Sequence, residues 1–246
     1  MKNTLSFILQ ICLAIILALA VRTFVVEPFR IPSGSMIPTL QVGDYIIVTK
    51  YSYGYSKASF PFDAFNLFEG RFWASLPRVG DVVVFREPAH PNTYFVKRVI
   101  GLPGDKIQVL NSQLYINGTL IPRVYVNSYE AYPSDGQLPF LAQEYIETLP
   151  NGHKHYILQQ NNLQPPNPAD NTQVFVVPQG TFFVMGDDRD DSEDSRFAEV
   201  GYIPLQNLVG RARYVVASMD FEYYPAWEFW EWPWEIRWHR FFLKIQ

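Results

Sequence analysis

The residues that could do chemistry begin with two serines in segment 31–40, separated by a single glycine and bracketed by prolines. Proline fixes the backbone angle φ, and Gly34 can adopt backbone angles that are closed to other residues. The hydroxyls of Ser33 and Ser35 can therefore be presented at a fixed angle. A serine hydroxyl is a weak nucleophile until a base removes its proton, so the chain must supply that base elsewhere.

Lys97 is the candidate base. Residues 94–100 read as a strand, and the alternation of a strand places Lys97 on one face together with Phe95 and Val99. Burial among apolar side chains lowers the pKa of a lysine amine from about 10.4, and a neutral amine could take the serine proton. The alternative is a lysine whose amine reaches solvent or pairs with an aspartate.

An acidic run at residues 186–196 is the third candidate segment. Arg189 and Arg196 stand within it, and they predict internal ion pairs that hold the shape of a loop. Such a loop would present Ser192 or Ser195 inward. Without internal ion pairs, the run would be a solvated acidic loop.

Two alternatives would place a metal in this chain. Counted from Asp188, the acidic run matches a calcium loop until Glu193 stands where that loop needs glycine. His153 and His155 could lie on one face of a strand, but no third ligand is in view. We therefore expect no metal and no cofactor.

The histidines also lie in loop-like or tail sequence without a carboxylate pattern, so none is assigned as the base of a Ser-His-Asp triad (His90, His153, His155, His239).

The elements that must position these residues read as β strands. Short β-branched and aromatic runs, separated by Gly, Pro or Asp, occur at 45–48, 82–85, 94–100, 174–177, 182–185 and 214–216. Asn117 and Gly118 between two further runs predict a tight hairpin. The fold class is therefore mainly β, with an antiparallel barrel or sandwich as the core.

The composition shifts toward Asn, Gln and Pro within this β sequence, most visibly at 159–170. We interpret 108–180 as an inserted β-rich region that carries a solvated loop. The predicted core then consists of 27–107 and 181–216, and 217–246 forms an aromatic C-terminal tail.

Residues 1–26 predict a single transmembrane helix. Residues 5–21 are almost entirely apolar, and adding 22–26 gives a helix about as long as a bilayer core is thick. A cleavable secretory signal is the alternative, but the residues after the apolar run contain no small-x-small pattern. The Lys and Arg counts on the two sides barely differ, so charge orients the helix only weakly.

Charge and cysteine content exclude other classes. The 246 residues carry a net charge of −4 and no basic run, which argues against nucleic-acid binding. The single cysteine, Cys12, lies in the apolar helix, so the chain has no internal disulfide and no cysteine nucleophile in its folded part.

Tryptophan gathers at the C-terminal end. Five of the six tryptophans fall in the last twenty residues, which predicts either a shallow contact with the membrane interface or packing on the β core (Trp227, Trp230, Trp232, Trp234, Trp238). Interleaved glutamates argue against deep insertion.

Four segments together resemble, in order, the motifs of bacterial type I signal peptidases: 33–40, 80–85, 97–105 and 186–196. The resemblance covers the helix and most of the predicted core, and it matches the insertion in position more than in sequence. It implies a membrane-bound serine endopeptidase. Asp188 and Asp191 depart from the pattern, since the family often carries Asn there; their charge would raise the pKa of a nearby lysine.

The resemblance also implies roles for single residues. Ser35 resembles the family nucleophile and Lys97 its general base, while Ser33 and the Ser35 amide resemble the oxyanion hole. The family has residues that orient and support the lysine, and these match Ser192, Asp187, Arg189, Asp194 and Arg196. Shallow apolar pockets for small substrate side chains match Phe29, Ile31, Pro32, Leu40, Phe95 and Val96.

The implied function is the removal of signal peptides from secreted preproteins. The implied partners are signal-peptide-bearing preproteins and membrane lipid, and the implied location is the bacterial plasma membrane, with one span and the catalytic part outside the cytoplasm. Two rivals are a non-catalytic membrane-tethered β scaffold, which an exposed Lys97 would favour, and a self-cleaving Ser-Lys protease, which would need a DNA-binding head.

Overall fold

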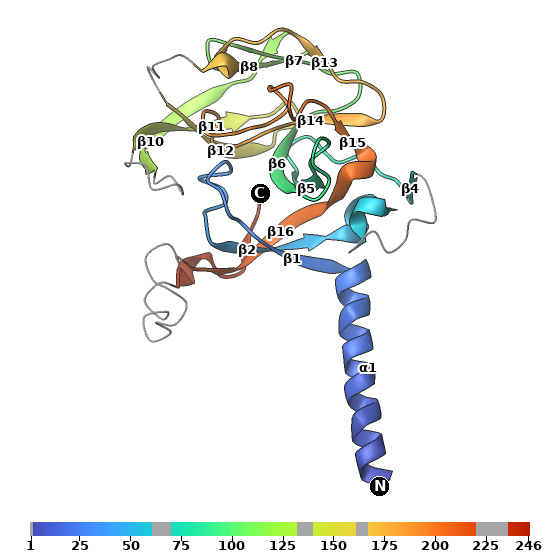
Figure 1. The fold of residues 1–246 in the computed structure, drawn as a ribbon. Helices are drawn as coiled ribbons and strands as arrows, with labels where there is room; N and C mark the ends of the chain where they lie inside the picture. The colour runs from blue at the N-terminus through green and yellow to red at the C-terminus, as the bar shows by residue number, and fades with distance from the viewer. Residues whose placement is uncertain (1, 61–69, 132–139, 161–166, 220–235) are drawn as a thin grey trace.

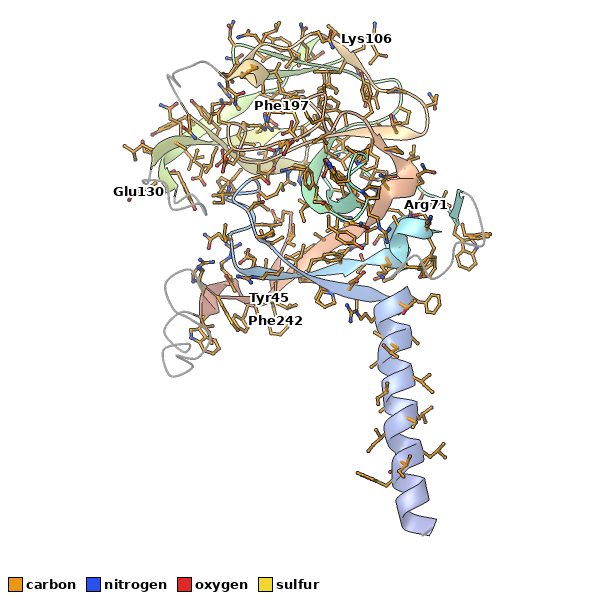
Figure 2. The ribbon with its side chains drawn as sticks, in the orientation of Figure 1. Tyr45, Arg71, Lys106, Glu130, Phe197 and Phe242 are labelled. Atoms are coloured by element: carbon orange, nitrogen blue, oxygen red, sulfur yellow. The ribbon has the colours of Figure 1, made fainter. Side chains whose placement is uncertain are left out.

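The protein consists of one long helix and a β body. The computed structural model describes residues 2–60, 70–131, 140–160, 167–219 and 236–246. Helix α1 (Lys2–Phe24) extends away from the body, and Figure 2 shows its side chains projecting around it with no other element beside them. Its segment Ser6–Phe24 has a mean hydropathy of 2.3 and is long enough to cross a bilayer.

The largest sheet has eight strands and curls on itself (Figure 1). Its order is β1-β2-β16-β5-β6-β14-β15, with β17 added to β16, and all of its ladders are antiparallel. The strands are β1 (Val26–Arg30), β2 (Asp44–Thr49), β5 (Val82–Arg86), β6 (Tyr94–Gly101), β14 (Thr181–Met185), β15 (Ile203–Pro204), β16 (Leu208–Ser218) and β17 (Leu243–Lys244).

Three smaller sheets complete the body. One has the order β10-β11-β12, a second β13-β7-β8-β9, and a third pairs β3 with β4. Their strands are β3 (Tyr55–Ser56), β4 (Arg71–Phe72), β7 (Lys106–Leu110), β8 (Gln113–Ile116), β9 (Thr119–Leu120), β10 (Arg123–Ala131), β11 (Phe140–Thr148), β12 (Lys154–Gln159) and β13 (Phe175–Val176). Short 3-10 turns are η1 (Lys50–Tyr53), η2 (Lys57–Ser59), η4 (Pro168–Asp170), η5 (Leu205–Asn207) and η6 (Trp238–Arg240).

Apolar side chains cover both faces of β5 and β6. Val82 and Val84 belong to one buried cluster and Val83 and Phe85 to another, as the alternation of a strand requires. A third cluster lies between β14 and the four-stranded sheet. The main sheet is therefore buried on both faces where it carries Lys97.

The helix is joined closely to the main sheet. Only Val25 separates α1 from β1. The Tyr55 hydroxyl donates to the carbonyl oxygen of Phe24 at 2.6 Å, and the Lys50 amine lies 2.8 Å from a carboxylate oxygen of Glu27. Lys50 is completely buried, and this ion pair joins β1 to η1 just beyond the end of the helix.

The predicted mainly-β class and the N-terminal apolar helix are confirmed. Every predicted strand is present, and Asn117 and Gly118 form the hairpin turn with φ values of 54° and 78°. Strand β7 begins two residues before the predicted start of the insertion, and the domain boundaries stay a prediction. Of the C-terminal tryptophans, only Trp238 lies within the described residues, and it is exposed.

Candidate active site

Ser35 lies on the loop between β1 and β2. Hydrogen bonds from the Ile37 amide to the Gly34 carbonyl oxygen and from the Leu40 amide to the Met36 carbonyl oxygen, both 2.8 Å, give this loop its shape. Met36 and Leu40 are buried in the core cluster, which anchors the loop on both sides of the serine backbone. The loop therefore holds Ser35 in one place.

Lys97 on β6 lies beside Ser35, with 2.6 Å between Lys97 Nζ and Ser35 Oγ. The lysine is only 4% exposed, because β5 pairs with its strand and apolar clusters cover it. Its amine also lies 5.6 Å from the centre of the Phe95 ring. The predicted face of Phe95, Lys97 and Val99 is thus apolar and dry.

Burial lowers the pKa of Lys97 to about 8. Desolvation of the ammonium form is the largest cause, and the charge of Asp194 opposes it. Arg196 lowers the pKa further. At pH 7 about a tenth of the amines are therefore neutral, against well under a thousandth for a free lysine.

The acidic loop 186–196 packs against both residues. Ser192 donates to Asp194 at 2.8 Å, and the Gly186 amide donates to the same carboxylate at 2.9 Å. A β-carbon at Gly186 would stand 2.2 Å from Ser192 Oγ and 2.5 Å from the Ser35 carbonyl oxygen, so only glycine fits. The Ser192 hydroxyl thus donates its hydrogen bond to Asp194, the residue whose charge raises the pKa of Lys97.

The two arginines of this loop have different partners. Arg196 binds Asp194 through two hydrogen bonds of 2.8 Å, an ion pair within the loop. The prediction of an internal pair is wrong for Arg189, whose guanidinium binds Glu147 on β11. The reason is that Arg189 points toward the three-stranded sheet, where Glu147 is buried. A buried carboxylate without a paired cation would be strongly destabilising.

Asp187 belongs to a separate buried cluster on the other face of β6. Arg98 donates to both of its carboxylate oxygens, at 2.7 and 2.6 Å. Thr39, from the loop that carries Ser35, donates to the same carboxylate at 2.5 Å. This cluster therefore ties the serine loop to β6. Thr39 lies inside the first motif, but its sequence position alone did not predict this contact.

Asp188 does not bring the negative charge that its residue type suggests. Its pKa is raised to about 8, first by burial and second by the charge of Asp191. The carboxyl group is therefore largely protonated at neutral pH. Asp191 is exposed and does act on Lys97, since its charge raises the lysine pKa.

The predicted pocket residues lie around the same loop. Phe29 and Val96 are half-buried against the cluster that contains Ile31 and Leu40, whereas Phe95 faces the opposite cluster. Pro32 and Ser33 are exposed on the loop surface. The Phe29 and Tyr94 rings lie 5.3 Å apart, so β1 and the start of β6 approach each other across the sheet.

The histidines differ from the prediction. His155 lies in β12, is buried, and stands 3.4 Å from Glu147; His90 lies 3.0 Å from Glu87. The prediction of loop-like sequence is therefore wrong for His155, which lies on a strand beside the neighbouring strand's Glu147. The partner of His90, Glu87, is only three residues away along the chain. Among the described residues, no group of three or more His, Cys, Asp or Glu side chains is placed to hold a metal ion.

Comparisons with known proteins found a matching family model and several similar proteins. The family model for "Signal peptidase, peptidase S26" matches residues 4–217. Signal peptidase I of Rickettsia prowazekii is 42% identical over 214 residues, 85% of this chain and 77% of the relative, and that of Rickettsia felis is 42% identical over 217 residues, 87% and 78%. The crystal structure of a signal peptidase I from Enterococcus faecalis aligns with 25% identity and a TM-score of 0.33, covering 56% of this chain and 97% of the other.

Proposed function

Because the chain belongs to the signal peptidase family, peptidase S26, we propose that it removes signal peptides from preproteins with a Ser35–Lys97 dyad while anchored in a membrane by α1. The observation that carries this proposal is the 2.6 Å contact between the buried amine of Lys97 and the Ser35 hydroxyl. Residues 27–107 and 181–216 form the catalytic core in this proposal, with 108–180 inserted in it.

The proposed reaction begins when neutral Lys97 takes the proton of Ser35. Ser35 Oγ then attacks the carbonyl carbon of the scissile peptide bond, and the Ser35 amide and the Ser33 hydroxyl stabilise the resulting oxyanion. Lys97 passes its proton to the leaving amine, which leaves an acyl-enzyme on Ser35. A water activated by the same amine releases the cleaved signal peptide.

Two unpaired strand edges support binding of an extended substrate. Within the described residues, β1 is the end strand of its sheet, and residues 94–97 of β6 pair only with β5. The Phe29–Tyr94 contact brings these edges together next to the serine loop. A substrate strand could add to them by backbone hydrogen bonds, and the half-buried Phe29 and Val96 would leave room only for small side chains.

The proposed orientation places α1 in the bacterial plasma membrane with the β body outside the cytoplasm. Secreted preproteins present their cleavage sites on that side, close to the bilayer surface. The location of the Lys97 amine argues against the non-catalytic scaffold, since that rival is favoured by an exposed lysine and Lys97 is buried.

Cleavage of a purified preprotein in detergent tests the proposal. Ser35→Ala and Lys97→Ala are expected to abolish the cut after the small-x-small site, and Lys106→Ala, which changes an exposed lysine on β7, should cut like the wild type. Cutting at that site by both active-site variants would remove the dyad from the mechanism.

A further inference from the structure

Glu147 is a buried carboxylate on β11, outside the sequence motifs that point to the active site. It is 1% exposed, and its two oxygens lie 2.9 and 2.5 Å from the two terminal nitrogens of Arg189. This two-fold geometry fixes both the position and the orientation of the guanidinium. Neighbouring His155 is neutral, because burial and the charges of Arg98 and Arg189 hold its pKa well below the usual range.

Because Glu147 holds Arg189, it also helps to hold loop 186–196, to which Arg189 is hydrogen-bonded. Its Nε donates to the Gly186 carbonyl oxygen at 3.2 Å, and its own carbonyl oxygen accepts from Arg196 at 2.7 Å. Arg196 in turn holds Asp194, the side chain whose charge most raises the Lys97 pKa. A continuous series of buried contacts therefore runs from β11 to Asp194, whose charge acts on the lysine.

Backbone hydrogen bonds hold the same loop between β12 and the serine. The Leu158 amide donates to the Asp187 carbonyl oxygen at 2.9 Å, and the Arg189 amide donates to the Leu158 carbonyl oxygen at 3.0 Å. On the other side the Asp188 amide donates to the Ser35 carbonyl oxygen at 3.2 Å. A shift of the loop relative to the three-stranded sheet would thus move the backbone beneath Ser35.

We propose that Glu147 is a positioning residue for peptide cleavage, and that the β10-β11-β12 sheet is part of the catalytic unit through its pair with Arg189. The inference rests on the proposed Ser35–Lys97 mechanism. Glu147 does not touch the reacting atoms; through Arg189 it holds loop 186–196 in place against the backbone of Ser35.

Glu147→Gln keeps the shape of the side chain and removes the charge that Arg189 requires. We expect kcat to fall by about 10- to 100-fold with KM unchanged, because a small displacement near the reacting groups has a large effect on rate. Desolvation affects the pKa of Lys97 more than the opposing charge of Asp194 does, so water admitted beside the amine should move the midpoint of the kcat pH profile upward.

Glu144→Gln is the matched control, since Glu144 lies on the same strand and is also buried, but among the described residues it has no arginine partner. It should leave kcat and the midpoint unchanged. The double exchange Glu147→Arg with Arg189→Glu restores the pair in reverse and should recover part of the kcat that either single exchange loses. Circular dichroism of the full chain in detergent gives the folded fraction by which each kcat is divided.

The outcomes separate the inference from the mechanism on which it rests. A Glu147→Gln enzyme that melts earlier but keeps the wild-type kcat and midpoint per folded molecule would overturn the inference and leave a purely structural ion pair. If Glu147→Gln does not fold, Glu147→Asp is measured in its place, with a smaller change in the same direction expected and no change counting against the inference. Cleavage by Ser35→Ala would instead refute the dyad itself.

Discussion

Lys97 and Arg98 are consecutive residues on one strand, and both are buried cations, 4% and 0% exposed. Arg98 has two hydrogen bonds to the carboxylate of Asp187 and another to the Gly80 carbonyl oxygen at 2.7 Å. Lys97 has a serine hydroxyl and an aromatic ring near its amine, while Asp194, the acidic group that most raises its pKa, is already bound by Arg196.

The difference between the two faces shows what makes a buried cation structural or reactive. A buried guanidinium that is paired with a carboxylate holds two segments of the chain together. An amine in an equally dry place, but without a carboxylate of its own, gives up its proton near neutral pH. The arrangement of counter-charges around β6, more than the depth of burial, separates the two roles.

The largest effect on activity is expected from Lys97→Met. We expect signal-peptide cleavage to fall by about 10⁴-fold, the loss typical when a general base is removed. At pH 7 the melting temperature should rise by a few degrees, because burying the ammonium form costs about 3 kcal/mol for a pKa lowered from 10.5 to about 8. Calorimetry and a preprotein cleavage assay measure both. A fall in both activity and melting temperature would mean that Lys97 holds the fold.

Asp187→Asn tests the opposite face. It leaves the guanidinium of Arg98 buried without its counter-charge, which should cost about 3 to 5 kcal/mol of unfolding free energy. Urea unfolding followed by tryptophan fluorescence measures the loss. Glu130→Gln, on an exposed position of β10, is the control and should change stability by less than about 0.5 kcal/mol. An Asp187→Asn protein as stable as this control would show that the pair contributes little.

The pH dependence tests the role of Lys97, because its pKa of about 8 lies in a range that an activity assay can reach. We expect kcat/KM to rise with pH around a midpoint of about 8, the pKa of Lys97. Between pH 8 and 10.5 the unfolded lysine binds a proton that the folded one has lost, so the free energy of unfolding should increase with pH in that window. Lys97→Met should abolish this increase. An unchanged slope in the variant would assign the increase to another group.

The smallest effect is expected from Asp191→Asn. The negative charge of Asp191 raises the pKa of Lys97, so its removal should move the midpoint of kcat/KM down by a few tenths of a pH unit. Glu199→Gln, which removes an exposed carboxylate farther along the chain, should leave the midpoint in place. An upward movement in Asp191→Asn would contradict the expected sign.

The sequence predicted those parts of the molecule that depend on local pattern. The β-branched run of β6 indicated both the strand and the face on which Lys97 lies, because side chains alternate along any strand. The Asn117-Gly118 turn was equally local. The proximity of Ser35 and Lys97 had to be taken from a family resemblance, since 62 residues separate them.

Contacts between separate sheets could not be predicted from local sequence patterns. The partner of Arg189 lies 42 residues earlier on β11, and nothing in the sequence around Glu147 distinguishes it from a solvated glutamate. The protonation of Asp188 likewise follows from burial beneath the serine loop, which residue type alone does not reveal. Both concern the charges around the lysine, where distant segments of the chain meet.

The single residue between α1 and β1 has a consequence for substrate choice. The Tyr55–Phe24 hydrogen bond and the short connection tie the β body to the end of α1. In the proposed function, with α1 inserted in a membrane, the nucleophile would therefore keep a set distance from the bilayer, and enzyme and preprotein would meet by lateral diffusion in two dimensions. This joint would then set the distance between the bilayer surface and Ser35. Lengthening it by a short flexible linker would move the preferred cleavage site toward positions farther from the lipid.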